Sequence, residues 1–186
     1  RLECERIGAN VKGVDPEEFP PVATGDDRPA VRIPAREFRS MIDQVAFCAA
    51  RDESRPVLSG VNVRMEGTVL SLAAADGFRL AIRTAELDHG LPEALDVIIP
   101  ARALTELGRL LSGDDDEVEV SVTGNRTQVL FRVRTAAGET VLVSRLLEGQ
   151  FPDLQRVVPK TALTEVTVAR TDLVTAIKVA SIFARD

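Results

Sequence analysis

AVRIPAREF at residues 30–38 and DVIIPARAL at residues 96–104 share the tetrapeptide IPAR. The two copies begin at Ile33 and Ile99, so they lie 66 residues apart (99 − 33). In each stretch, residues typical of a strand precede the tetrapeptide, and apolar residues at helical spacing follow it. We therefore interpret the two copies as equivalent points of a duplicated unit, where a first strand joins a helix.

Both copies are followed by the same order of predicted elements, which is one helix and then three strands. Apolar residues spaced three and four apart indicate the helices, over 38–49 and 104–111. Alternating apolar residues indicate the strands, and turn sequences such as Asp76-Gly77 separate them. The alternations fall in 61–65, 70–72, 80–82, 118–122, 129–133 and 141–143. Each unit is thus predicted to be βαβββ, and the first strand of the second unit is predicted at 97–99.

A longer repeat indicates how the chain divides into domains. Phe19-Pro20 recurs as Phe151-Pro152, at an offset of 132 (151 − 19), which is twice 66. The stretch VRIPAREFRSMIDQVAF, from Val31, also aligns with VTVARTDLVTAIKVASI, from Val166. We therefore predict the end of one domain in 1–24, a complete domain in 25–158 and the start of a third in 159–186. Repeats normally pack on neighbouring copies, so we expect a larger parent protein.

Composition narrows the class of protein. The 186 residues are 45% hydrophobic and 28% charged, as in an ordinary soluble globular protein. A net charge of −6 argues against a protein that coats nucleic acid with its whole surface, but it allows a local basic lining. No apolar run approaches the roughly 20 residues that span a bilayer. We expect a cytoplasmic protein, and we do not expect its first residue to be the true start.

The chain contains no convincing catalytic or cofactor-binding motif. Cys4 and Cys48 have no CxxC spacing, so neither a disulfide framework nor a zinc site is indicated. The single histidine, His89, is interpreted as a solvated loop residue, because a Ser-His-Asp triad needs partners that the sequence does not suggest. The acidic run at 113–117 lacks EF-hand spacing and is interpreted as a solvated turn. We predict a non-catalytic protein without metal or cofactor.

Arginines on the two predicted helices give the first functional signal. Arg36 and Arg102 lie in the first helical turns, where the helix dipole disfavours a cation. An external anion would compensate, and one interpretation is a surface that contacts DNA phosphates without reading bases. The other interpretation, favoured by spacing alone, is ordinary solvated helix surface. Acidic residues such as Glu106 reduce the net positive charge of each helix face.

The stretches SRPVLSGVNVRMEGTVLSLAAADGFRLAIR (54–83) and EGQFPDLQRVVP (148–159) resemble the middle domain of the bacterial DNA polymerase III beta subunit, the sliding clamp. The resemblance covers essentially the whole chain. It implies an α+β DNA clamp fold with two βαβββ units per domain and helices on one face of antiparallel sheets. In that family, three-domain subunits pair into a homodimeric ring around duplex DNA, so the resemblance implies a processivity factor that tethers the replicative polymerase.

The resemblance also implies two kinds of site. Helices line the ring in that family, and the candidate DNA-facing residues here are Arg36, Arg39, Arg51, Arg55, Arg102 and Arg109. A hydrophobic pocket in that family takes short linear motifs from polymerases, the clamp loader and repair proteins. Its middle-domain wall would be Leu58, Ala75, Gly77, Phe78, Arg79, Leu80, Pro152, Arg156 and Val157. The rest of the wall is expected from the end of the third domain.

The chain departs from the family pattern at two places. Pro56 and Val57 stand where aromatic residues near DNA are frequent, and Ala75 replaces a common threonine. Taken alone, the stretch AAADGFRLA also fits a plain hairpin corner in which Asp-Gly makes the turn and Leu80 enters the core.

Incomplete outer domains also affect the expected assembly. The ring-closing surfaces of the family lie on the first and third domains, so we expect no stable ring from these 186 residues. The alternative function is a stand-alone peptide-binding adaptor that keeps the pocket without the ring, and a weaker one is an uncharacterised hydrolase.

Overall fold

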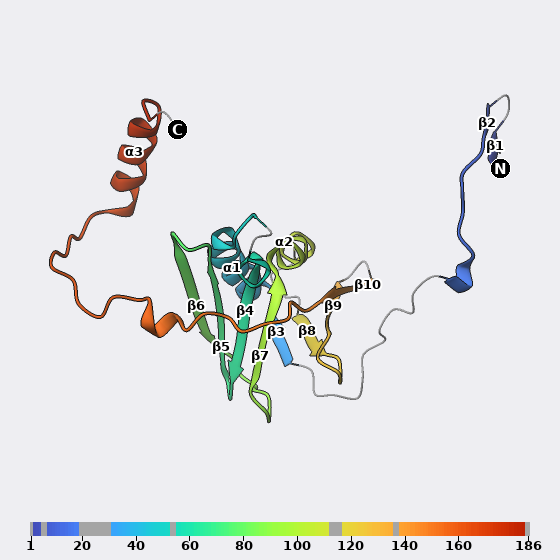
Figure 1. The fold of residues 1–186 in the computed structure, drawn as a ribbon, viewed down its shortest axis with the longest axis horizontal. Coiled ribbons are helices and arrows are strands. Elements are labelled where there is room, and N and C mark those ends of the chain that lie inside the picture. Colours follow the sequence, from blue (N-terminus) through green and yellow to red (C-terminus); the bar gives the residue numbers. More distant parts are fainter. Residues whose placement is uncertain are drawn as a thin grey trace. The chain divides into compact units, whose positions relative to one another are not determined.

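The computed structural model describes residues 2–4, 7–18, 31–52, 55–111, 117–135 and 138–184, which Figure 1 colours along the chain. The chain divides into two compact units, 1–151 and 152–186, and each is described by itself. The boundary expected at residue 24, the Phe19-Pro20 pair and the first four residues of the acidic run lie outside the described residues.

The elements of the first unit follow the predicted order twice. A short hairpin of β1 (Leu2–Cys4) and β2 (Ile7–Ala9) and a 3₁₀ turn, η1 (Pro16–Glu18), precede the repeats. The first repeat contains β3 (Val31–Pro34), α1 (Ala35–Val45), η2 (Ala46–Cys48), η3 (Pro56–Ser59), β4 (Gly60–Glu66), β5 (Val69–Ala75) and β6 (Leu80–Glu86). The second contains β7 (Leu95–Pro100), α2 (Ala101–Leu110), β8 (Glu117–Val122), β9 (Gln128–Thr135) and β10 (Gly138–Arg145). The two predicted βαβββ units are confirmed.

The second compact unit contains a 3₁₀ turn, η4 (Leu154–Arg156), and one helix, α3 (Arg170–Ser181). Apolar side chains such as Leu173 and Ile177 are exposed along this helix.

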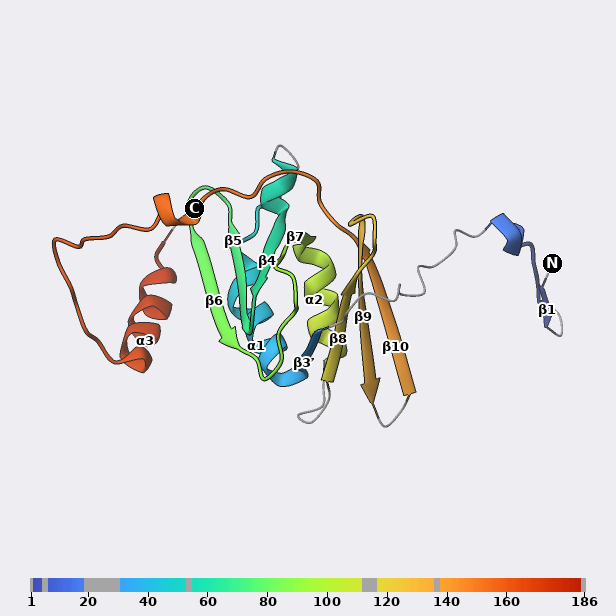
Figure 2. The ribbon, with the colours of Figure 1, turned by 90° about the horizontal axis from the view of Figure 1, so that it is seen from below.

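The two repeats exchange their first strands. The sheet orders are β10-β9-β8-β3 and β6-β5-β4-β7, and every pairing is antiparallel. Strand β3 of the first repeat pairs with β8 of the second, with Ile33 opposite Val118. Strand β7 of the second repeat pairs with β4 of the first, with Val97 opposite Val63. Each helix therefore carries the chain from one sheet to the other (Figures 1 and 2).

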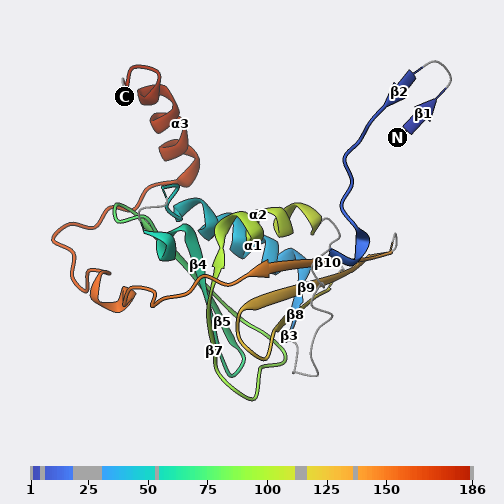
Figure 3. The same cartoon turned by 45° about the vertical axis from the view of Figure 1, so that its right-hand side comes forward.

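The IPAR tetrapeptide makes the same strand-to-helix junction in both repeats. Pro34 and Pro100 are the N-cap residues of α1 and α2, with φ and ψ of −55° and 126° in the first and −50° and 128° in the second. A proline at the end of a strand has no N–H to donate to the sheet, and its fixed φ suits the turn into a helix. Figure 3 shows the two helices side by side on one side of the sheets.

A single hydrophobic core runs through both repeats. Helix α1 buries Phe38 and Met41, and α2 buries Leu104 and Leu107, all with side chains at most 1% exposed. The ring of Phe38 packs against that of Phe131 in β9, with 6.3 Å between the ring centroids. Because this pair joins the helix of one repeat to a strand of the other, the repeats are expected to fold as one body.

The edge strands β6 and β10 leave some of their larger apolar side chains exposed. Ile82 and Val141 are exposed, while their strands turn Ala85 and Leu142 toward the core side, with Leu142 opposite Phe131. Leu80, which the hairpin-corner interpretation placed in the core, is only half-buried and lies in the same alternate row as Ile82. Alternation therefore located these strands, but it does not show which apolar residues of an edge strand are buried.

Candidate functional site

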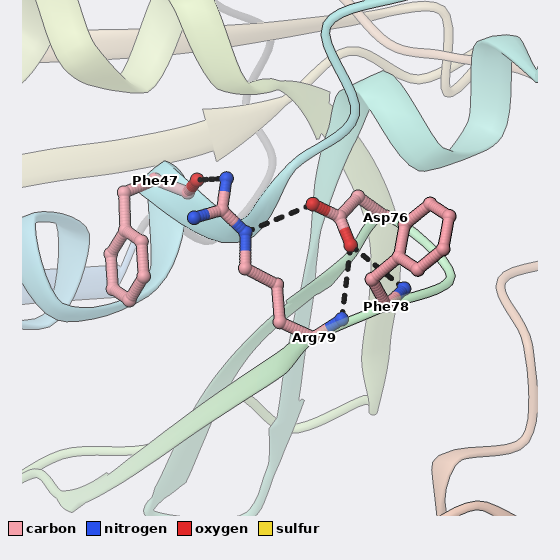
Figure 4. Close-up of polar contacts among 4 residues, drawn as sticks. All are labelled: Phe47, Asp76, Phe78 and Arg79. Carbon is pink, nitrogen blue, oxygen red and sulfur yellow. Dashed lines mark hydrogen bonds and ion pairs between the residues drawn. The ribbon is translucent and has the colours of Figure 1, made fainter. Parts of the chain in front are cut away.

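The turn between β5 and β6 is organised by the carboxylate of Asp76 (Figure 4). Its Oδ1 accepts hydrogen bonds from the backbone N–H groups of Phe78 and Arg79, at 2.9 and 3.0 Å. Its Oδ2 accepts one from Nε of Arg79, at 2.9 Å. Hydrogen bonds from Phe78 and Arg79 to the ionised form hold the pKa of Asp76 below its ordinary value. Gly77, with φ of +93°, supplies the left-handed residue that the turn requires.

Arg79 joins this turn to the end of helix α1. Its Nη2 donates to the backbone carbonyl of Phe47 at 2.9 Å. Its guanidinium carbon also lies 5.5 Å from the centroid of the Phe47 ring, within the range of a cation–π interaction. Phe47 lies in η2, directly after α1, and its side chain is 57% exposed. The guanidinium is therefore fixed between Asp76 on one side and Phe47 on the other, as Figure 4 shows.

The segment after α1 returns to the same corner. The backbone N–H of Ala50 donates to the carbonyl of Leu58 at 2.8 Å, and that of Leu58 donates to the carbonyl of Arg55 at 2.9 Å. A Cβ added to Gly77 would lie 3.6 Å from Nη1 of Arg55. The structure therefore brings Arg55, predicted to face DNA, beside Gly77, predicted to line the pocket.

The predicted pocket residues of the first unit gather around this corner. Leu58 is buried, Ala75 and Leu80 are paired across β5 and β6, and the side chain of Phe78 is 100% exposed. Figure 4 shows the Phe78 ring pointing away from the Arg79 guanidinium. These positions agree with a rim that presents apolar surface to a partner, and the pocket itself stays a prediction.

The other predicted pocket residues belong to the second unit. Pro152, Arg156 and Val157 are exposed, and Nε of Arg156 lies 3.1 Å from the carboxylate of Asp153. The N–H of Val157 donates to the carbonyl of Leu154 at 3.0 Å, which places Val157 just after η4.

Two hollows within the first unit share no lining residue with the predicted pocket. One, of about 450 Å³, lies where β7 meets the segment after β10 and is lined by residues that include Ile98, Arg126 and Leu147. The other, of about 390 Å³, lies between the loop before β7 and β8, and is lined by residues that include Leu91 and Val120. Neither contains a residue predicted for partner binding.

All six arginines predicted to face DNA are exposed, but they differ in their contacts. Arg36 and Arg102 occupy the second position of α1 and of α2. Arg39 donates from Nη1 to the carbonyl of Leu111 at 3.0 Å, so it caps the C-terminal end of α2. Arg109 pairs with Glu106 on its own helix at 2.7 Å. Helices α1 and α2 therefore carry several exposed guanidinium groups.

Asp76 and Phe47 are the two residues of the corner that the sequence reasoning missed. The signal for Asp76 is that Gly77 follows it directly and that Arg79, a side-chain donor, lies three residues after it. This arrangement is common in Asx-turns. The signal for Phe47 is its position outside the apolar stripe that continues through Val45 and Cys48.

Two exchanged four-stranded sheets, with one helix from each repeat packed side by side against them, define a DNA sliding-clamp domain. Residues 32–153 match the family model of the DNA polymerase III beta subunit, central domain. The chain belongs to this family, so the predicted family and the predicted α+β clamp fold are confirmed.

Individual relatives agree with the family match. Over 177 residues the chain is 34% identical to the beta sliding clamp of Bacillus subtilis (strain 168), an alignment that covers 95% of this chain and 45% of that protein. The crystal structure of the DNA polymerase sliding clamp from Bacillus subtilis has a TM-score of 0.84 at 35% identity, over 93% of this chain and 44% of that one. The chain therefore spans less than half the length of these relatives.

A Pseudomonas aeruginosa sliding clamp (DNA polymerase III subunit beta) was crystallised bound to griselimycin. It has a TM-score of 0.77 at 29% identity, over 89% of this chain and 43% of that one. Among the helices that the structure describes, none combines the length and the apolar character needed to cross a membrane.

Proposed function

We propose that this chain is the central part of a sliding clamp that encircles duplex DNA and tethers the replicative polymerase and other partners, without catalysis of its own. The observation that carries the proposal is the paired helices α1 and α2, which present exposed arginines from both repeats on one side of two sheets. Residues 25–158 would be the middle domain, between the end of a first domain and the start of a third. The full protein would act as a homodimeric ring in the cytoplasm.

Sequence-independent sliding is consistent with the charges of this surface. Guanidinium groups contact phosphates without reading bases, and the net charge of −6 limits binding to one local surface. Arg109 already has a partner in Glu106, so each contact with DNA would be weak. Weak contacts are what a protein requires if it is to move along DNA.

The DNA-facing role can be tested with two matched arginine variants. In the full-length parent protein, Arg102→Ala combined with Arg109→Ala should lower DNA retention, because two phosphate contacts are lost. The slope of log affinity against log salt should fall by roughly 0.9 for each contact.

Arg134→Ala is the matched control, because Arg134 pairs with Glu139 at 2.9 Å and its side chain is 64% exposed, against 70% for Arg109. This control should behave as the unaltered protein does. Retention that is unchanged across a salt series in the double variant would remove both helical arginines from the DNA-facing surface.

We also propose that the corner at Gly77–Leu80 forms one wall of a partner-peptide pocket, with Leu58 and Ala75 beside it. The Phe78 side chain supports this, because a large apolar side chain that is 100% exposed is available to a partner. Pro152, Arg156 and Val157 stay candidate pocket residues through the family resemblance alone. Griselimycin, which a related clamp binds, is a suitable probe, and calorimetric titration showing no binding to the full-length parent protein would contradict the pocket.

A further inference from the structure

We propose that Asp76 is a positioning residue of the partner-peptide pocket: its carboxylate holds the Arg79 guanidinium against Phe47 and fixes the backbone that presents Phe78. This inference rests on the pocket proposed above and deepens it. It assigns roles to two residues, Asp76 and Phe47, that lie outside the predicted pocket wall.

The geometry separates the two oxygens of Asp76 into two tasks. Oδ1 accepts from the backbone N–H groups of Phe78 and Arg79 and so sets the turn. Oδ2 accepts from Nε of Arg79, which is a contact between side chains. The Asp76 side chain is 19% exposed and that of Arg79 is 50% exposed, so the carboxylate is sheltered and the guanidinium remains accessible. One side chain therefore fixes both the turn and the orientation of the cation.

Arg79 needs this support because its side chain is long and flexible. Ordering such a side chain on binding costs free energy, and a group that is already held in place avoids much of that cost. Here Asp76 holds Nε, the carbonyl of Phe47 holds Nη2, and the Phe47 ring lies under the guanidinium. A partner that contacts this corner would therefore meet a preformed surface made from the end of α1 and the β5–β6 turn.

The test separates the two tasks of Asp76 with the substitution Asp76→Asn. The amide oxygen can still accept from the backbone N–H groups, but an amide NH₂ cannot accept from Nε of Arg79. Loss of one charge-assisted hydrogen bond at a half-exposed site should weaken griselimycin binding to the full-length parent protein by about five- to tenfold. Phe47→Leu removes the ring but keeps the carbonyl, and should weaken binding by about two- to threefold.

Glu66→Gln is the control, because it removes the negative charge from another exposed ion pair on the same sheet, that of Arg64 with Glu66. Binding by this variant should be unchanged. The Nε–H resonance of Arg79 in ¹H–¹⁵N spectra supplies a readout that a general loss of stability would not mimic. It should be protected from exchange in the unaltered protein and in Glu66→Gln, and lose that protection in Asp76→Asn.

The possible results separate the positioning role of Asp76 from the existence of the peptide pocket. If the unaltered protein does not bind griselimycin, the pocket is wrong and the positioning role is overturned with it. If the unaltered protein binds but Asp76→Asn binds equally well, the pocket stands and the positioning role is wrong. Weaker binding with an unchanged Arg79 Nε–H signal would also overturn it, because Asp76 would then act by another route.

Discussion

Substitution of Phe131 by alanine should destabilise both repeats together. The Phe131 side chain is 0% exposed, and its ring packs on Phe38 across the boundary between the repeats. Removing a buried phenylalanine ring costs about 3–5 kcal/mol, because apolar contacts are lost and a cavity is left. That is a large part of the roughly 5–15 kcal/mol by which a domain is stable.

The loss can be measured by urea denaturation. With a loss of about 4 kcal/mol and a urea dependence of about 2 kcal/mol per molar, the midpoint should fall by about 2 M. The chain contains no Trp or Tyr, so circular dichroism and amide NMR signals are better probes than intrinsic fluorescence. Amides of α1 and of β9 should lose their signals over the same urea range.

Phe78→Ala is the matched control, because it makes the same chemical change at a side chain that is 100% exposed. Its midpoint should stay close to that of the unaltered chain. A cost of less than about 1 kcal/mol for Phe131→Ala, well below the range for a buried ring, would show that this ring does not support the core. Unfolding of the second repeat while the first remained intact would refute the shared core.

Three further predictions concern stability. Gly108→Ala should stabilise the chain by about 0.5–1 kcal/mol, because alanine favours a helix and its Cβ would lie 3.7 Å from Cγ2 of Ile42; a lower urea midpoint would show that this space is insufficient. Gly60→Ala should destabilise it by about 1–3 kcal/mol, because its Cβ would lie 3.1 Å from a backbone oxygen and closer still to two side chains; a thermal melt at an unchanged temperature would contradict this. Asp76 and Glu139 have lowered pKa values in the folded chain, so the stability they contribute is present above their ordinary values of 3.8 and 4.5 and is lost as the pH falls through the folded values. The urea midpoint should therefore decline at acid pH, and less steeply in Glu139→Gln; an equal decline in both proteins would exclude Glu139.

The order of elements could be predicted because local patterns determine it. The IPAR copies mark the strand-to-helix junctions, and apolar spacing locates each helix and strand. The exchange of β3 and β7 could not be predicted, because pairing between distant strands leaves no local pattern. Alternation also does not show which face of an edge strand is buried, as the exposed Ile82 and Val141 illustrate, since a neighbour on only one side weakens the link between apolar character and burial.

The functional corner was only partly predictable. Gly77, Phe78 and Arg79 could be placed together because they are adjacent in the sequence. Phe47 lies 32 residues from Arg79 and reaches it only because α1 ends beside the β5–β6 turn, which is a tertiary relation. Asp76 was treated as part of a turn, although its second oxygen also orients a side chain.

The exchange of first strands has a consequence for how such a domain could have arisen. A single repeat standing alone would have an unpaired first strand. The edge of its own three-stranded sheet, where the first strand of the other repeat pairs in the present domain, would also be unpaired. The unpaired strand of one copy could pair with the unpaired sheet edge of another. Two identical copies related by two-fold symmetry, as in a homodimer, could therefore pair both strands. The present domain is then equivalent to such a dimer made permanent by a covalent link, and the segment between β6 and β7 is that link.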